Sequence, residues 1–227
     1  MKIHLISDTH NKHKEFNLSE GDVLIHSGDA TGRGQSGEIH KFLSWFEKQN
    51  YTHKIFVPGN HDFGFETDTV RYKEECEKRG ITLLVDSGIE IEGIKIWGSP
   101  ITPTFFNWAF MRDRGEKIAK HWESIPEDTE ILITHGPAYG IRDKVTNHWS
   151  PNGEQVGCMD LRVRIAQLAN LRLHVFGHIH DEAGTSLIGQ YIAANAALLN
   201  DEYRKAYEPI KVFIENGFYS VLKSDKE

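Results

Sequence analysis

Short apolar runs, rich in Ile, Leu and Val, alternate with polar and amphipathic segments along this chain. Runs of this kind, bounded by Gly, Pro, Asn or Asp, are typical of buried strands. Five of the runs are followed by clustered polar residues: 2–7, 23–27, 54–57, 131–134 and 173–176. Further strands are predicted at 81–85, 89–92, 94–98, 190–194, 210–215 and 218–222, where Glu92-Gly93 and Asn216-Gly217 mark hairpin turns.

Helical spacing of apolar residues appears between several of these strands. In residues 36–49, the side chains of Ile39, Phe42, Leu43 and Phe46 would share one helix face and pack on a sheet. Further helices are predicted at 67–79, 111–122 and 156–171, and residues 146–157 are predicted to form a polar surface loop. Periodicity therefore predicts an α/β protein with mixed sheets. No linker or repeat divides the single domain expected over residues 1–227.

The polar residues that follow the strands are common metal ligands: Asp8, His10, Asp29, Asn60, His135, His178 and His180. Open α/β sheets bind ligands outside the carboxyl ends of their strands, so these side chains should form one cluster at one edge of a sheet. Gly28, Gly59 and Gly177 would let the backbone turn sharply as it leaves three of the strands.

The spacing and number of these side chains indicate two metal ions. Residues two apart in an extended segment point the same way, so Asp8 and His10 can reach one ion together, as can His178 and His180. The whole set is too large for one tetrahedral zinc ion, which takes about four ligands, but suits two ions that share a carboxylate. Nitrogen and oxygen donors without thiolates favour Mn, Fe, Zn, Co or Ni over Ca or Mg.

Taken in order, these motifs resemble the calcineurin-like metallophosphoesterase superfamily. The motifs are Asp8-Thr9-His10, Gly28-Asp29, Gly59-Asn60-His61-Asp62, His135 and Gly177-His178-Ile179-His180. Residues 22–29, 131–137, 156–158 and 173–180 further resemble the small metallophosphoesterase-domain-containing proteins of that superfamily. The resemblance implies a four-layer α/β/β/α sandwich, in which helices flank two mixed β-sheets and the metal site lies at the C-terminal edge of the strands.

The resemblance also implies a role for each residue of the site. One metal would be held by Asp8, His10, Asp29 and His180, and the other by Asp29, Asn60, His135 and His178, with Asp29 bridging the two. His61 would act as the general acid for the leaving oxygen, and Asp62 would orient His61. Asn60 and His61, together with Asn11 and Arg33 on nearby loops, are predicted to contact the substrate.

Composition limits this interpretation. Hydrophobic residues make up 39% and charged residues 26% of the chain, as in an ordinary soluble protein, and no apolar run is long enough for a membrane span. The net charge of −7 disfavours broad nucleic-acid binding. Because Cys76 and Cys158 form no CxxC motif and the first strand starts at Lys2, we expect a cytoplasmic protein without a cleaved signal. Core or lid packing is expected, in preference to base stacking, for Phe105, Phe106, Trp108 and Phe110.

The sequence therefore predicts a dinuclear, metal-dependent phosphoesterase, with manganese favoured, that hydrolyses phosphodiester bonds of small substrates by attack of a metal-bridging hydroxide. Cyclic and other nucleotides are candidate substrates. A diester is favoured because few basic residues follow the ligand segments, and Asp181-Glu182 would repel the second charge of a monoester. The alternatives are a broad-specificity phosphomonoesterase and a nucleotide-binding regulatory protein with weak activity; a nuclease is disfavoured by the acidic net charge.

Overall fold

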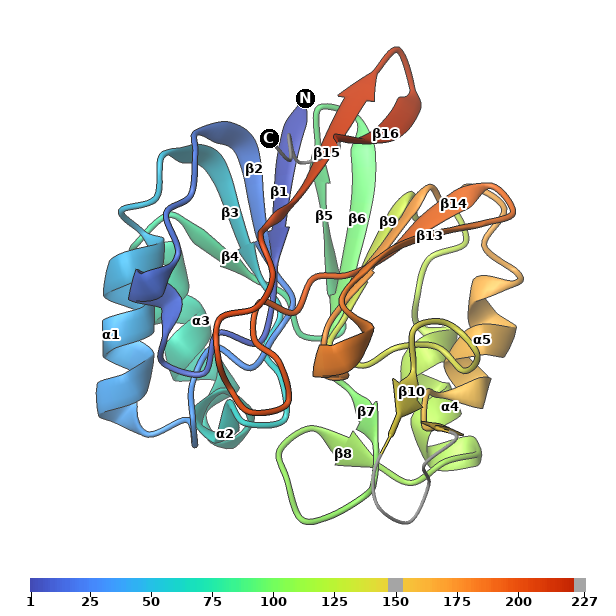
Figure 1. The fold of residues 1–227 in the computed structure, drawn as a ribbon, viewed down its shortest axis with the longest axis horizontal. Coiled ribbons are helices and arrows are strands. Elements are labelled where there is room, and N and C mark those ends of the chain that lie inside the picture. The colour runs from blue at the N-terminus through green and yellow to red at the C-terminus, as the bar shows by residue number, and fades with distance from the viewer. Residues whose placement is uncertain (147–152, 223–227) are drawn as a thin grey trace.

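Two six-stranded mixed sheets form the centre of the protein in a computed structural model that describes residues 1–146 and 153–222 (Figure 1). The first sheet has the strand order β16-β15-β1-β2-β3-β4. Strands β1 to β4 run parallel, and β15 and β16 pair in antiparallel fashion. The strands are β1 (Lys2–Ile6), β2 (Gly21–His26), β3 (Tyr51–Phe56), β4 (Ile81–Leu83), β15 (Ile210–Glu215) and β16 (Phe218–Leu222).

The second sheet has the order β13-β14-β12-β9-β6-β5. Its central strands run parallel, and each edge strand forms an antiparallel hairpin with its neighbour. The strands are β5 (Ser87–Ile91), β6 (Ile94–Ser99), β9 (Ile131–Thr134), β12 (Leu173–Phe176), β13 (Gly184–Ile188) and β14 (Tyr191–Asn195). Two short pairs lie outside the sheets: β7 (Thr102–Pro103) with β8 (Met111–Arg112), and β10 (Lys144–Val145) with β11 (Glu154–Gln155).

Helices cover the outer face of each sheet (Figure 1). The first sheet is covered by α1 (Ser36–Phe46), α2 (Phe63–Thr67) and α3 (Thr69–Glu77), and the second by α4 (Glu116–Glu123) and α5 (Met159–Ile165). Two short 3-10 turns are η1 (His13–Glu15) and η2 (His180–Glu182). As predicted, Ile39, Phe42, Leu43 and Phe46 form the buried face of α1. Across the described ranges, no helix combines the length with the apolar content that a membrane span requires.

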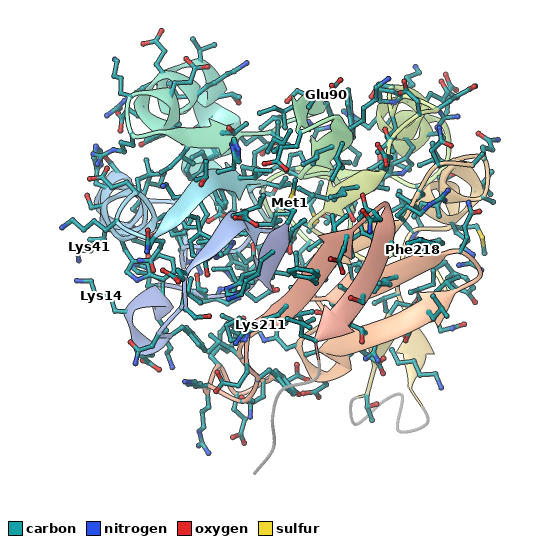
Figure 2. All side chains as sticks on the ribbon, turned by 90° about the horizontal axis from the view of Figure 1, so that it is seen from above. Met1, Lys14, Lys41, Glu90, Lys211 and Phe218 are labelled. Atoms are coloured by element: carbon teal, nitrogen blue, oxygen red, sulfur yellow. The ribbon has the colours of Figure 1, made fainter. Side chains whose placement is uncertain are left out.

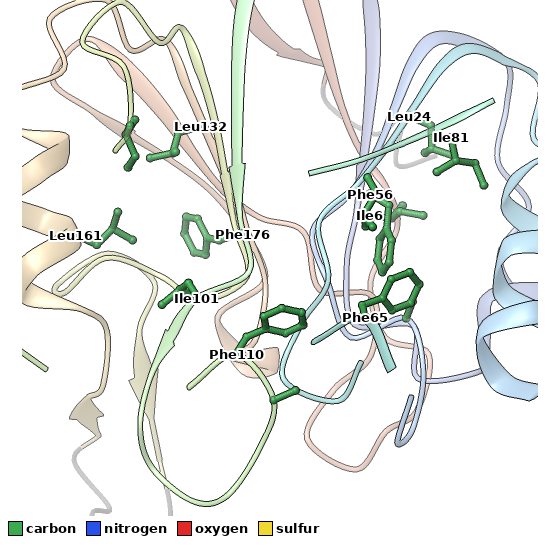
Figure 3. Packing of buried hydrophobic residues seen from close by; sticks show 14 of the residues in the cluster. Ile6, Leu24, Phe56, Phe65, Ile81, Ile101, Phe110, Leu132, Leu161 and Phe176 are labelled. Carbon is green, nitrogen blue, oxygen red and sulfur yellow. The ribbon is translucent and has the colours of Figure 1, made fainter. Parts of the chain in front are cut away.

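Side chains that alternate along the strands belong to different buried clusters, one between the two sheets and the other beneath the helices. Ile3 of β1 and Ile133 of β9 belong to the buried cluster between the two sheets. The opposite faces of the strands pack under the helices, and Figure 3 shows Phe56 on the side of the first sheet and Phe176 on the side of the second. Because side chains alternate between the faces of a strand, this arrangement yields the four layers that the resemblance implies.

The structure corrects several predicted elements. The helix predicted from residue 111 begins at Glu116, because β8 pairs with β7 and Gly115 takes a φ of 83° before α4. The helix predicted over 156–171 spans only Met159–Ile165. Strand β11 lies within the predicted loop 146–157, of which residues 147–152 fall outside the described ranges. Helix α2 and strand β13 are additional to the predicted elements.

Candidate metal centre

The loops that leave β1, β2, β3, β9 and β12 bring the predicted ligands together at one edge of the two sheets. Nitrogen and carboxylate atoms of six of these ligands and of His61 form three groups, and within each group all of these atoms lie within 4.8 Å of one another. The groups are Asp8 with His10 and His180, His10 with Asp29 and His61, and Asp29 with His135 and His178. Because His10 and Asp29 each belong to two groups, the three form one continuous cluster.

Several of these ligands have left-handed backbone conformations, which residues other than glycine rarely adopt. The φ angles are 54° at Asp8, 40° at His10, 53° at Asp29 and 71° at His178. Backbone hydrogen bonds hold the turns: the N–H of Asp8 donates to the carbonyl of Gly28 (2.9 Å), and that of His10 to the carbonyl of Asp29 (3.0 Å). Strained backbone of this kind is concentrated at functional sites.

Two glycines allow the ligand loops to approach each other closely. A Cβ added to Gly177 would lie 2.0 Å from Asp8 Oδ2, and one added to Gly28, whose φ is +115°, would lie 2.3 Å from His135 Nδ1. The sequence predicts sharp turns at these glycines. The structure shows in addition that a side chain at either position would displace a ligand.

The first part of the cluster lies between β1 and β12. Nε2 of His180 lies 3.3 Å from Nε2 of His10 and 3.4 Å from Asp8 Oδ1. On its other side, the His180 ring donates from Nδ1 to the carbonyl oxygen of Asn200 (3.0 Å). This hydrogen bond fixes the ring and directs Nε2 towards the cluster, as is usual for metal-binding histidines.

The second part is built in the same way. His135 donates from Nδ1 to the carbonyl oxygen of Ser27 (3.0 Å), and its Nε2 faces Asn60 Oδ1 at 3.0 Å and Asp29 Oδ2 at 3.4 Å. The same Oδ2 of Asp29 lies 3.7 Å from His10 Nε2 in the first part. Asp29 is therefore the side chain that connects the two parts.

Negative charge concentrates at these atoms, and the pKa values of two of the histidines, His135 and His180, reflect it. Burial disfavours the charged form of His135, but the carboxylate of Asp29 outweighs burial and raises the pKa to about 9. Asp8 likewise outweighs burial at His180 and raises its pKa to about 9. The pKa of Asp29 is held well below its usual range, against the effect of burial, by His135. Carboxylate, amide and imidazole donors that converge in this way fit two divalent transition-metal ions.

His61 lies beside the cluster and is held on two sides. Its Nδ1 donates to the carbonyl oxygen of Gly32 (2.8 Å), and its Nε2 lies 3.9 Å from Asp29 Oδ2. The ring stacks on Trp108 with centroids 4.3 Å apart and an angle of 28° between the planes. The guanidinium of Arg33 lies over the same Trp108 ring, 5.7 Å from its centroid.

The structure corrects the predicted role of Asp62. The sequence predicts that Asp62 orients His61, but Gly32 makes that hydrogen bond. The buried Asp62 carboxylate instead accepts from the backbone N–H groups of Gly59 (2.8 Å), Ala30 (3.2 Å) and Thr31 (3.0 Å), and from the Thr31 hydroxyl (2.7 Å). Burial, and then the nearby Asp29, raise the pKa of Asp62 to about 6. Asp62 therefore ties together the loops that carry Asp29 and Asn60.

Two predicted substrate contacts are also placed differently. The side-chain amide of Asn11 donates to Glu38 (2.6 Å), and Arg33 lies over Trp108. Among the residues that the structure describes, neither Asn11 nor Arg33 lines the cavity next to the cluster. Neighbouring groups thus hold both side chains, and their contact with a substrate stays a prediction.

A cavity of about 1090 Å³ opens beside the cluster, and His10, Asp29, Asn60, His61, His178 and His180 contribute to its wall. Tyr203 also lines it and packs its ring against those of His10 (4.8 Å) and His180 (5.3 Å). No sequence pattern identifies Tyr203, because it lies beyond the last motif at no recognisable spacing. Of the aromatic residues expected in core or lid packing, Phe110 is buried, whereas Phe105, Phe106 and Trp108 line the cavity.

Comparison with known proteins agrees with this geometry. The family model for calcineurin-like phosphoesterases matches residues 1–182. Human metallophosphoesterase domain-containing protein 1 is 34% identical over 229 residues, which cover 91% of this chain and 69% of the human protein. A UPF0046 protein of Caenorhabditis elegans is 36% identical over 226 residues, which cover 90% of this chain and 78% of the worm protein.

Solved structures share the fold at low sequence identity. A structure described as a novel archaeal phosphodiesterase is 17% identical, with a TM-score of 0.50 and coverage of 98% of this chain and 99% of that protein. Another structure reaches a TM-score of 0.57 at 16% identity and covers 98% of both chains. These structures support the fold, and the family match and the identity to the curated relatives decide the assignment: the chain belongs to the calcineurin-like phosphoesterase family.

Proposed function

We propose that the protein is a dinuclear metal-dependent phosphodiesterase that acts on small phosphate esters. The observation that carries the proposal is the position of Asp29, whose Oδ2 lies 3.4 Å from His135 Nε2 on one side and 3.7 Å from His10 Nε2 on the other. Two divalent transition-metal ions, with manganese favoured, would activate water and polarise phosphate oxygens there. The ligands would be Asp8, His10, Asp29 and His180 for one ion, and Asp29, Asn60, His135 and His178 for the other.

His61 is placed to donate a proton to the leaving oxygen. Its hydrogen bond to Gly32 holds the ring so that Nε2 faces the cluster, and the stack on Trp108 restrains the plane of the ring. A positioned general acid contributes roughly 10²–10⁴-fold to the rate. His61 lines the cavity beside Asp29 and Asn60, so it would contact the same phosphate group that they face.

The charge around the cavity supports a diester in preference to a monoester. Arg114 is the one Lys or Arg among the described lining residues, and its guanidinium donates to the carbonyl oxygens of Val156 and Gly157. Glu154 and Asp201 add negative charge to the wall. A monoester dianion would meet these carboxylates with one more charge than a diester and, apart from the metal ions, with little compensation from cationic side chains. The archaeal structure that shares the fold is described as a phosphodiesterase.

The test compares kcat/KM for bis(p-nitrophenyl) phosphate and p-nitrophenyl phosphate at one pH and one manganese concentration. We expect the diester to be the better substrate, and we expect metal-stripped protein to lose both activities. His135→Ala, purified in parallel, controls for a contaminating phosphatase because it should also be inactive. A preference for the monoester of about tenfold or more would replace the proposal with a broad phosphomonoesterase. Absence of turnover with retained nucleotide binding would support a regulatory protein.

A further inference from the structure

The loop between β7 and β8 carries aromatic side chains from the metal centre towards solvent. Phe105 is 48% exposed and Phe106 is 72% exposed. Large apolar side chains left in water forgo the stabilisation that burial would give, and a contiguous group of them commonly marks a binding site. Both rings line the cavity beside the metal ligands.

The position of this loop is fixed relative to the metal centre. The N–H of Ala109 donates to the carbonyl oxygen of Asn60 (3.1 Å), which links the end of the loop to a predicted metal ligand. At the start of the loop, the ring of Phe105 lies 5.5 Å from the ring of His178. A phosphate held by the ligands would therefore carry its ester groups directly beside the aromatic loop.

Apolar side chains from other elements line the same cavity. Tyr139 and Met159 are both partly exposed, and Val156 lies close to Met159 in the chain. The cavity of about 1090 Å³ is much larger than a phosphate group requires and is comparable in volume to the larger small-molecule sites of proteins. Hydrophobic groups therefore contribute much of the cavity wall beyond the ligands, and the charged residues among the rest of the wall are mostly acidic.

We propose that this apolar rim, defined as Phe105, Phe106, Tyr139 and Met159, binds an uncharged apolar or aromatic ester group of the phosphodiester substrate. The inference rests on the proposed function, because the phosphate of that substrate would bind at the metal centre. The rim selects diesters whose second ester group is hydrophobic over diesters whose second group is small or charged. Complete burial of one methylene group increases binding affinity about fourfold. Because the rim is partly open to solvent, each added methylene of the ester group should increase affinity about twofold.

The test uses methyl, butyl, hexyl and benzyl esters of p-nitrophenyl phosphate with the manganese-loaded protein. The leaving group is the same in all four, so differences in kcat/KM report how the other ester group binds. We expect kcat/KM to rise by about twofold for each added methylene and the benzyl ester to exceed the methyl ester by about tenfold or more. In Phe105→Ala and Phe106→Ala, the ratio of hexyl to methyl ester should fall by at least about fivefold.

Phe218→Ala is the matched control. Phe218 is 80% exposed on β16 (Figure 2) and is absent from the described cavity wall, so the same loss of a phenyl group there should leave the whole series unchanged. A series that is flat in the wild-type protein would overturn the inference. So would a p-nitrophenyl nucleoside 5′-phosphate that exceeds the hexyl ester about tenfold or more, because polar recognition of a base would then dominate.

Binding measurements separate this inference from the proposed function. If none of the esters is hydrolysed, the proposed function has failed, and calorimetry with dimethyl, dibutyl and dihexyl phosphate then tests the rim alone. Affinity should rise with chain length in the wild-type protein and in Phe218→Ala, and much less in Phe106→Ala. An affinity that does not depend on chain length would overturn the inference.

Discussion

Among single residues, Asp29 has the widest influence on the site, because its carboxylate faces imidazoles on two sides. Asp29→Asn preserves the shape of the side chain but removes its charge, so both metal ions should bind more weakly and turnover should fall. Changing even a residue behind a ligand costs roughly 10–100-fold, and we expect at least that loss here. His178→Ala removes one donor from one group and should weaken mainly one ion. Elemental analysis beside turnover measures both; wild-type metal content in Asp29→Asn would contradict the cluster.

His61 offers a second test at the scale of the residue. His61→Gln should retain the metals and lower kcat by roughly 10²–10⁴-fold. The loss should be larger for alkyl esters than for nitrophenyl esters, because nitrophenolate leaves without a proton. Trp108→Ala removes the ring stacked on His61 and should cause a smaller loss, of about tenfold, with the same dependence on the leaving group.

A double substitution shows whether Trp108 acts through His61. In the His61→Gln background, Trp108→Ala should have little further effect, because interacting residues are not additive. Trp108→Phe, which keeps a stacking ring, should restore most of the loss in the wild-type background. The measurement is kcat for an alkyl ester and a nitrophenyl ester in each variant. Fully additive losses, equal for both esters, would mean that Trp108 acts elsewhere.

At the scale of elements, the strands and the ligands at their ends follow from local sequence. Each of β1, β2, β3, β9 and β12 contains a short run of buried apolar residues, and a predicted ligand follows within four residues of its end, so one pattern predicts both the strand and its ligand. The partners of loop side chains depend instead on distant segments. The side chain of Asn11 donates a hydrogen bond to Glu38, and Tyr203, in a loop after β14, packs its ring against His10. Such contacts leave no periodic signal, and the pairing of β8 with β7 likewise outweighs local helix propensity.

The turn after β12 yields a prediction at this scale. In Gly177→Ala, the new Cβ would lie 2.0 Å from Asp8 Oδ2 and 2.2 Å from Ser7 Oγ, so either the turn or the ligand must move. Overpacking of this kind lowers the free energy of unfolding by about 1–3 kcal/mol, and the metal content of the variant should fall as well. Gly37→Ala in α1 is the matched control, since its Cβ would meet no atom of the described residues within 4 Å. Chemical denaturation and metal analysis of both variants check this; equal behaviour of the two would contradict it.

At the scale of the whole molecule, two buried histidines make the fold sensitive to acid. Burial lowers the pKa of His26 and His174 to about 3, from 6.5 in an unperturbed chain. Folding therefore favours their neutral forms. The resulting stability is complete above about pH 6.5 and is lost as the pH falls from there towards 3. We expect Tm to drop steadily from pH 6.5 to pH 4.5. A Tm that stays constant over this range would show that the two sites do not contribute.

Two histidines of the metal centre, His135 and His180, change the stability of the fold with pH in the opposite direction. Asp29 and Asp8 raise the pKa of His135 and His180 to about 9, so protons stabilise the metal-free protein below about pH 6.5, and this stabilisation is lost as the pH rises through 9. Metal ions compete with the same protons, so metal affinity should increase as the pH rises towards 9. Metal binding is therefore best measured at mildly alkaline pH.

The count of bound metal ions tests the central claim most directly. Stripped protein is reloaded with manganese at about pH 8, freed of excess metal, and analysed for metal per chain, with His135→Ala treated in the same way. Two ions per chain in the wild-type protein, and about one in His135→Ala, is the result that the arrangement around Asp29 predicts. Saturation at a single ion in the wild-type protein, with every ligand intact, would contradict a dinuclear centre.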